Sequence, residues 1–278
     1  MMKIAVCLYG KYGTQTKHAL GKEFDALDYH KNWKENLIKN NPNFTFVFFI
    51  HSWSYEQRKK IQDFYRPKAS NIEKPYFHFS LRYLINYALT NIQRQSNRAK
   101  TILLFIWSFF AKTSISESPY YRAASGSLSQ AKSTENAIKI LEEDTSEDID
   151  YVILSRIDLV FLKKIDLSFL ENRKKTIYLA SLNNHMQDLN FNKFSLPDGY
   201  DYSIERKKLN DMFLIFDKKL IKKFRKYYKD RKKLNLPSSP HKSYYDLFEK
   251  EILSKDYDIK FIPGGDFSIG RVTKGVFF

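Results

Sequence analysis

Arg156 and Asp158 are the residues whose types and spacing most directly permit chemistry. They follow residues 151–154, an apolar run that predicts a buried strand, and so lie at the carboxyl end of that strand. Ligand sites of open α/β sheets collect at such ends. A carboxylate supported by a guanidinium suits a divalent cation that holds a diphosphate, because Mg²⁺ binds one or two carboxylates together with phosphate oxygens. The same pair is also typical of a structural salt bridge.

Two other strand ends carry residues that could contact a ligand. Gly10 and Lys11 follow the first apolar run, and this loop either lets backbone N–H groups approach a phosphate or makes an ordinary turn. His51 and Trp53 follow the second run. Trp53 has two interpretations, an indole that stacks on a base or one that closes the domain edge. His51 is either a ligand contact or a hydrogen-bonded structural histidine.

Three further candidates come from later in the chain. Asp211 leads an apolar strand predicted at 211–216, and Asp266 follows the last predicted strand at 257–262. Gln130 lies on a predicted helix, from which it could face either the core or a cleft. We expect the polar groups at successive strand ends to form one site.

The sequence lacks the motifs of several other kinds of catalytic or metal site. The chain has no paired Cys/His spacing, no His-Glu-x-x-His, no serine nucleophile elbow and no P-loop lysine, so nucleophilic catalysis is unsupported. Cys7 is the single cysteine, which excludes an intrachain disulfide and makes a cysteine-rich zinc site implausible. Its place in the first predicted strand indicates a buried structural thiol.

The elements that must position these residues alternate between strands and helices. Strands are expected at 3–9, 44–50, 151–154, 176–181, 211–216 and 257–262, and helices at 25–40, 55–64, 127–143, 217–233 and 243–253. The apolar run at 44–50 favours burial on both faces, as in a parallel sheet. The pattern predicts an α/β fold with a mostly parallel sheet flanked by helices.

We expect one domain over 1–278, with a helical insertion at about 78–118 and a C-terminal basic helical part at about 217–256. The apolar run 101–110 is too short to span a bilayer, so it is either a buried core helix or a helix that docks on a membrane or partner. The polar stretch 182–209 is typical of a lid or a disordered loop.

The charge favours anionic partners. The formal net charge is +16 and the pI is about 9.6, which fits nucleic acid, an acidic membrane or phosphorylated substrates. No nucleic-acid motif accompanies the charge, which argues against nucleic acid. The basic, amphipathic helix 217–233 predicts a solvated face or attraction to anionic lipid. Without a signal peptide or spanning segment, we expect a cytoplasmic protein, peripheral at the inner face of the plasma membrane.

Four features together resemble bacterial GT-A-like glycosyltransferases that make capsular polysaccharide or lipopolysaccharide. They are the strand ending in Gly10, Phe-Ile-His-Ser-Trp at 49–53, Ser-x-x-Gln-x-x-Ser at 127–133 and Ser-Arg-x-Asp-Leu at 155–159. A carboxylate-aromatic strand beginning at Asp211 follows them. The resemblance covers about residues 3–54 and 127–216.

This resemblance implies a GT-A-like (Rossmann-like) fold and transfer of a sugar from a nucleotide-diphosphate donor to a cell-surface glycan or lipid-linked acceptor. Asp158 would be the second carboxylate of an Asp-x-Asp motif, in which Arg156 replaces the first. Mg²⁺ or Mn²⁺ would bind Asp158 with help from Asp266 or His241. Asp158 and Asp211 are the expected catalytic residues, with Asp211 as the general base of an inverting enzyme. Donor contacts are expected from Gly10, Lys11, His51, Trp53, Gln130, Arg156 and Asp158.

Three alternative classes remain open at this point. The charge permits a basic nucleic-acid-binding protein. The same scaffold could transfer a non-sugar phosphoryl substituent onto capsular glycan. A peripheral membrane scaffold without catalysis is the third.

Overall fold

The computed structural model describes residues 1–12, 24–74, 119–144, 148–170, 176–179, 212–230, 258–262 and 267–269. Its strands are β1 (Met2–Gly10), β2 (Phe44–Ser52), β3 (Ala69–Ile72), β4 (Tyr151–Arg156), β5 (Leu159–Phe161), β6 (Thr176–Leu179), β7 (Phe213–Asp217), β8 (Asp258–Phe261) and β9 (Phe267–Ile269). Within these residues, a seven-stranded sheet has the order β3-β2-β1-β4-β7-β6-β8, and β5 and β9 form a second, small sheet.

The large sheet is mostly parallel around β1. β1 pairs in parallel with β2 on one side and with β4 on the other, and β3 extends the parallel part beyond β2. β7 runs antiparallel to both of its neighbours, β4 and β6, and β8 is parallel to β6. The predicted α/β class, a mostly parallel sheet flanked by helices, is confirmed by this architecture.

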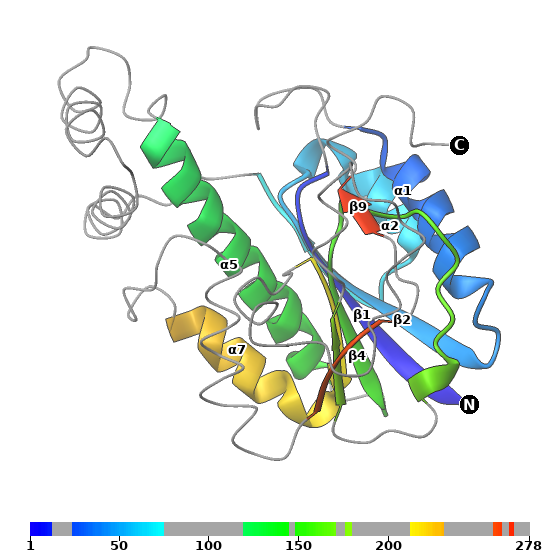
Figure 1. Cartoon of the computed structure of the whole chain (residues 1–278). Coiled ribbons are helices and arrows are strands. Elements are labelled where there is room, and N and C mark those ends of the chain that lie inside the picture. The colour runs from blue at the N-terminus through cyan, green and yellow to red at the C-terminus, as the bar shows by residue number, and fades with distance from the viewer. Residues whose placement is uncertain are drawn as a thin grey trace, which may run out of the picture.

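Helices cover both faces of the sheet (Figure 1). α1 (Ala26–Trp33) and α2 (Arg58–Tyr65) pack on one face, and α5 (Pro119–Glu143) and α7 (Ile221–Asp230) pack on the other. α1 continues as a π-helical segment, Lys34–Ile38, and short 3₁₀ turns occupy Tyr55–Gln57, Ser168–Leu170 and Lys218–Leu220. Among the described residues, no helix has both the length and the apolar character needed to cross a membrane.

The alternation of side chains along β1 explains this layering. Successive residues of a strand point to opposite faces of its sheet. Ile4, Val6 and Leu8 join the core under α1 and α2, whereas Ala5 and Cys7 join the core under α5 and α7. All five are fully buried, so β1 is apolar on both faces, as a central parallel strand must be.

Short strands and helix ends account for the differences from the predicted elements. β3, β5 and β9 were not predicted, because strands of three or four residues carry little periodicity of their own. β6 and β8 are equally short, but they lie within the longer predicted runs 176–181 and 257–262. α5 begins at Pro119 rather than at residue 127, and proline suits a first helical turn because that turn needs no backbone N–H.

Other predicted features lie outside the described residues. They are the insertion at 78–118 with its apolar run 101–110, the stretch 182–209 and the helix 243–253. Of the basic part predicted at 217–256, the structure describes the stretch up to residue 230, which contains α7. The organisation as one domain stays a prediction.

Candidate functional site

The carboxyl ends of β1, β2 and β4 meet at one edge of the sheet. Gly10 lies opposite Ser52 of β2, and Tyr9 lies opposite Arg156 of β4. The chain leaves β1 through α1 on one face, whereas α5, which precedes β4, packs on the other face. The connections therefore diverge between β1 and β4. This is a topological switch point, where ligands of open α/β sheets bind.

Gly10 makes the turn at the end of β1. Its φ of 106° lies in a region that favours glycine. Its N–H donates to Ser133 Oγ at 2.8 Å, and its carbonyl accepts from Ser52 Oγ at 3.0 Å and from the Trp53 N–H at 2.9 Å. Both backbone polar groups of this glycine are therefore held by neighbouring elements.

Tyr12 anchors the chain two residues further on. Its N–H donates to Ser54 Oγ at 3.1 Å, and its buried ring lies 5.0 Å from the ring of Tyr29 on α1. Lys11 thus lies between two anchored residues, with a partly exposed side chain. The described part of the predicted loop, residues 10–12, therefore places one cation beside the switch point.

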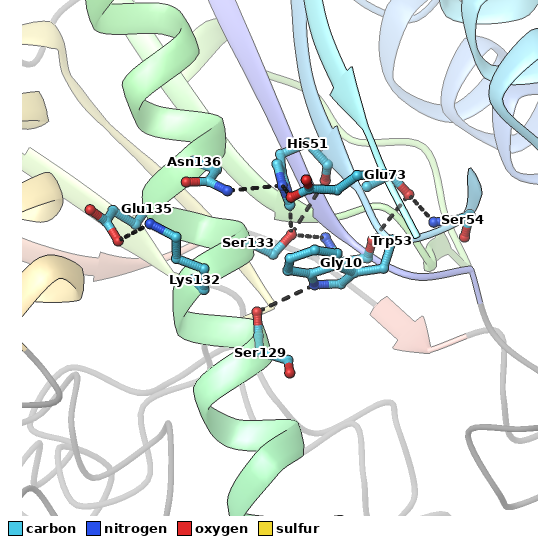
Figure 2. Close-up of polar contacts among 11 residues, drawn as sticks. Gly10, His51, Trp53, Ser54, Glu73, Ser129, Lys132, Ser133, Glu135 and Asn136 are labelled. Atoms are coloured by element: carbon cyan, nitrogen blue, oxygen red, sulfur yellow. Dashed lines mark hydrogen bonds and ion pairs between the residues drawn. The ribbon is translucent and has the colours of Figure 1, made fainter. Parts of the chain in front are cut away.

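His51 is a buried histidine at the end of β2, with hydrogen-bond partners on two other segments (Figure 2). Its Nδ1 lies 2.7 Å from Ser133 Oγ, and its Nε2 lies 3.0 Å from Glu73 Oε1 and 3.0 Å from Asn136 Nδ2. Ser133 and Asn136 are three residues apart on α5 and share one face of that helix. We call His51, Glu73, Ser133 and Asn136 the histidine cluster. It joins β2, the segment after β3 and α5.

Glu73 decides which nitrogen of neutral His51 carries the proton. A carboxylate only accepts, so Nε2–H donates to Glu73 and Nδ1 accepts from the Ser133 hydroxyl. The Ser133 oxygen then accepts the Gly10 N–H. The same tautomer orients the Asn136 amide with its oxygen toward Nε2–H, since amide oxygen and nitrogen are assigned by their hydrogen-bond partners.

The pKa of His51 is lowered from its ordinary value of 6.5. Burial is the main cause because it disfavours the imidazolium, and the hydrogen bond and charge of Glu73 oppose it. The Glu73 side chain is 38% exposed, so water screens the interaction between its charge and His51. The imidazole is therefore neutral at pH 7, which agrees with the tautomer above.

Serine, histidine and a carboxylate are also the residue types of hydrolase triads. Here, however, Ser133 is fully buried within α5, and its oxygen already accepts the Gly10 N–H. A nucleophile must reach its substrate, and this hydroxyl cannot. The histidine cluster therefore ties α5 to the carboxyl ends of β1 and β2.

Trp53 packs beside this cluster. This residue is 5% exposed, and its indole Nε1–H donates to the Ser129 carbonyl at 3.3 Å. The ring lies edge-on to the His51 ring, with 4.7 Å between the two ring centroids. These contacts favour the interpretation in which the indole closes the domain edge. The donor contact expected from Trp53 stays a prediction.

Arg156 and Asp158 form a bidentate ion pair. Arg156 Nε lies 2.7 Å from Asp158 Oδ1, and the terminal nitrogen Nη2 lies 2.7 Å from Oδ2. Asp158 is 1% exposed and the Arg156 side chain 16%. Both oxygens of the carboxylate are thus engaged by one guanidinium, in the parallel geometry that suits this pair.

Contacts on both sides of Asp158 position the pair. The Ile157 N–H donates to the Tyr9 carbonyl at 2.9 Å and so continues the β1–β4 ladder past Arg156. The indole N–H of Trp33 on α1 donates to the Leu159 carbonyl at 3.2 Å. Asp158 is therefore held between two segments that are fixed to the core.

The described residues do not by themselves fit a divalent metal ion. Across the described part of the chain, no three His, Cys, Asp or Glu side chains come close enough to hold one. Asp158 supplies one carboxylate, which Arg156 already binds, whereas Mg²⁺ needs a near-octahedral set of oxygens. The other predicted ligands, Asp266 and His241, lie outside the described residues. The metal site stays a prediction.

The remaining predicted residues are placed in part. Gln130 is half-buried on α5, one turn before Ser133 and on the same side of that helix. Asp211 lies outside the described residues, but Met212, next in sequence, accepts the Arg156 N–H at 3.0 Å through its carbonyl. The structure therefore brings Gly10, His51, Trp53, Arg156 and Asp158 to one sheet edge.

Sequence reasoning missed two members of the histidine cluster. Glu73 carried no signal because it follows β3, a strand that was not predicted. Asn136 lies within a predicted helix, but nothing in the sequence showed that it faces His51. Ser133 could have been found from the sequence, because it is the last residue of the Ser-x-x-Gln-x-x-Ser helix start and follows Gln130 by three residues.

No protein-family model matches this chain, and no curated protein matches it. Solved structures do align with it. One is a glycosyltransferase involved in glycosylation of the major capsid of PBCV-1, with 7% identity and a TM-score of 0.35, covering 94% of this chain and 81% of the other. A second is core-mannan synthase A from Aspergillus fumigatus in its Mn/GDP form, with 9% identity and a TM-score of 0.42, covering 96% and 74%.

A third aligned structure is a nucleoside-diphosphate-sugar pyrophosphorylase from Vibrio cholerae RC9. Its identity is 10% and its TM-score 0.39, and the alignment covers 97% of this chain and 96% of the other. At these scores and identities, we draw no functional conclusion from the three alignments.

Proposed function

We propose that this chain is a glycosyltransferase that moves a sugar from a nucleotide-diphosphate donor to a glycan acceptor. The observation that carries the proposal is the switch point between β1 and β4. There, the Gly10–Lys11 turn and the Arg156–Asp158 pair end adjacent parallel strands. The proposal also draws on the resemblance of four sequence blocks to GT-A-like glycosyltransferases.

In the proposed complex, the diphosphate lies over this edge of the sheet. Lys11 supplies a cation, and the glycine before it keeps the backbone free of a side chain where a phosphate would approach. Arg156 suits phosphate oxygens because its guanidinium is planar and permanently charged. Asp158 keeps that guanidinium in one orientation through two hydrogen bonds.

The remaining roles follow the resemblance. Asp211 is the proposed acceptor-side general base, and Asp158 with Asp266 is the proposed site for Mg²⁺ or Mn²⁺. Such an ion would neutralise charge on the leaving diphosphate when bound. The proposed acceptor is a capsular or lipopolysaccharide glycan, or its lipid-linked precursor.

The basic face of α7 supports the proposal that this reaction takes place at the inner face of the plasma membrane. Phe224 is buried against Phe216, whereas Lys222 and Lys226 of α7 are exposed, as is Lys219 in the 3₁₀ turn before it. Cations near an anionic membrane contribute about 1 kcal/mol each. Binding to vesicles with and without anionic lipid tests this part, with the double variant Lys222→Glu, Lys226→Glu as the comparison. Equal binding of both proteins would remove α7 from the proposal.

The activity test is release of nucleoside diphosphate from a panel of nucleotide sugars, with Mg²⁺, Mn²⁺ or EDTA. We expect the wild type to turn over at least one donor. Lys11→Ala should lose about tenfold or more in kcat/KM, which is the effect of losing one charged contact. Lys59→Ala, which removes an exposed lysine from α2, is the matched control.

Three results would count against the proposal. The wild type could bind and turn over no nucleotide sugar. The Lys11→Ala and Lys59→Ala variants could lose activity equally. Tight binding to nucleic acid that falls steeply with salt would instead favour the nucleic-acid alternative.

A further inference from the structure

We infer that Ser133 and His51 are positioning residues that set the geometry of the Gly10 turn, and through it the approach of the donor diphosphate. This inference rests on the proposed function. Neither side chain needs to touch the donor, since both are fully buried. They act through the backbone of Gly10.

The first step is the bond between Ser133 and Gly10. The hydroxyl oxygen accepts the Gly10 N–H at 2.8 Å, and these residues belong to different layers, α5 and β1. The carbonyl of the same glycine is held from the other side by Ser52 and Trp53. Ser133 therefore decides how the peptide that enters this turn is oriented.

The second step is the orientation of the Ser133 hydroxyl by His51 (Figure 2). The hydroxyl has one proton, and His51 Nδ1 at 2.7 Å is a closer acceptor than the His51 carbonyl at 3.4 Å. When the proton points to Nδ1, an oxygen lone pair remains for the Gly10 N–H. Glu73 keeps Nδ1 unprotonated by accepting from Nε2–H at 3.0 Å.

The consequence concerns the residue that follows the glycine. Without the Ser133 oxygen, the Gly10 N–H is a donor without its acceptor at the interface between α5 and the sheet, and the turn must shift to satisfy it. Lys11 follows directly, so its backbone and side chain shift too. A small displacement of a binding group is enough to weaken a charged contact.

The experiment compares two adjacent hydroxyl deletions on α5. Ser133→Ala removes the acceptor of the Gly10 N–H. Thr134→Ala is the matched control, because Thr134 is equally buried and its hydroxyl donates to the Gln130 carbonyl of its own helix at 2.9 Å. Both variants are compared at a temperature where both are folded, and their thermal midpoints are measured beside binding.

Two readouts are used. The first is the dissociation constant for nucleoside diphosphates, UDP and GDP among them, measured by calorimetry. We expect binding to weaken about tenfold in Ser133→Ala and less than twofold in Thr134→Ala. The second is amide hydrogen exchange of a peptide that contains Gly10, which should accelerate in Ser133→Ala alone.

The role of His51 is tested through its partner. Glu73→Gln keeps an amide oxygen that can accept from Nε2–H, so it should retain binding within about twofold of the wild type. The double variant Glu73→Leu, Asn136→Leu removes both oxygens that lie within 3.0 Å of Nε2 and should behave like Ser133→Ala. Equal effects of Glu73→Gln and this double variant would overturn the role given to the tautomer.

The outcomes separate the two proposals. A wild-type protein that binds no nucleoside diphosphate overturns the proposed function, while the exchange measurement still decides whether Ser133 positions Gly10. Wild-type binding with equal affinities and equal exchange in Ser133→Ala and Thr134→Ala overturns the inference and leaves the proposed function standing.

Discussion

The guanidinium of Arg156 binds both carboxylate oxygens of Asp158, with 2.7 Å from Nε to Oδ1 and 2.7 Å from Nη2 to Oδ2. The sequence placed this pair at a strand end and left open whether it is a ligand site or an ion pair. The structure shows the ion pair, almost entirely out of water. Any ligand role for either residue therefore comes in addition to a structural one.

Asp158→Ala should lower the free energy of unfolding by about 3–5 kcal/mol, because it leaves the Arg156 charge largely buried without its partner. Urea unfolding measures this change. The double variant Arg156→Met, Asp158→Leu should lose less than Asp158→Ala alone, since it removes both charges. A double variant as unstable as the sum of its single variants would contradict the buried pair. The activity of an Asp158 variant should therefore be compared with the wild type under conditions where both proteins are folded.

Protein stability should depend on pH through His51. Its pKa in the folded state is lowered below the ordinary 6.5, so the unfolded state binds more protons between the two values. The free energy of unfolding should therefore be greatest above about pH 6.5 and fall as the pH drops toward the lowered pKa. Denaturation at a series of pH values measures the slope.

The control for this pH effect is His30, a second histidine of the described residues with a lowered pKa. Burial lowers the pKa of His30, and the charge of Lys34 adds to the effect, so His30 contributes to the same slope. His51→Gln should reduce the slope while His30 still titrates, and the variant that lacks both histidines should reduce it further. An unchanged slope in His51→Gln would show that the buried cluster does not titrate as described.

Gly10→Ala should lower the free energy of unfolding by about 1–3 kcal/mol, because an L-residue at a φ of 106° is strained. A Cβ at this position would meet no atom of the described residues within 4 Å, so the cost comes from the backbone and not from a clash with them. Gly10→Ser should therefore cost about as much as Gly10→Ala. A cost that rises steeply with side-chain size would disprove this account.

Cys7 should be unreactive in the folded protein. It lies in the centre of β1, and burial raises the pKa of its thiol well above the usual range. A maleimide reagent at pH 7 should label the protein only as fast as it unfolds, and should label it fully in urea. Rapid labelling of the native protein would place β1 closer to the surface than the structure does.

The long elements could be predicted from the sequence because their periodicity is local. β1, β2, β4 and α1 lie close to their expected ranges, since apolar runs and helical spacing are properties of neighbouring residues. β3, β5 and β9 could not be predicted. These strands are stabilised by pairing with partners remote in sequence, as β5 pairs with β9.

The candidate site shows the same division. The sequence by itself determined which residue types stand at the strand ends, including Gly10, His51 and the Arg156–Asp158 pair, because strand ends follow from hydrophobic patterning. Only the tertiary structure decided what these residues do to one another. Packing of α5 on the sheet brings Ser133 to both Gly10 and His51, across 123 and 82 residues of sequence. No local sequence pattern predicts these contacts of Ser133, because they arise from the close packing of the helix on the sheet in the shared core.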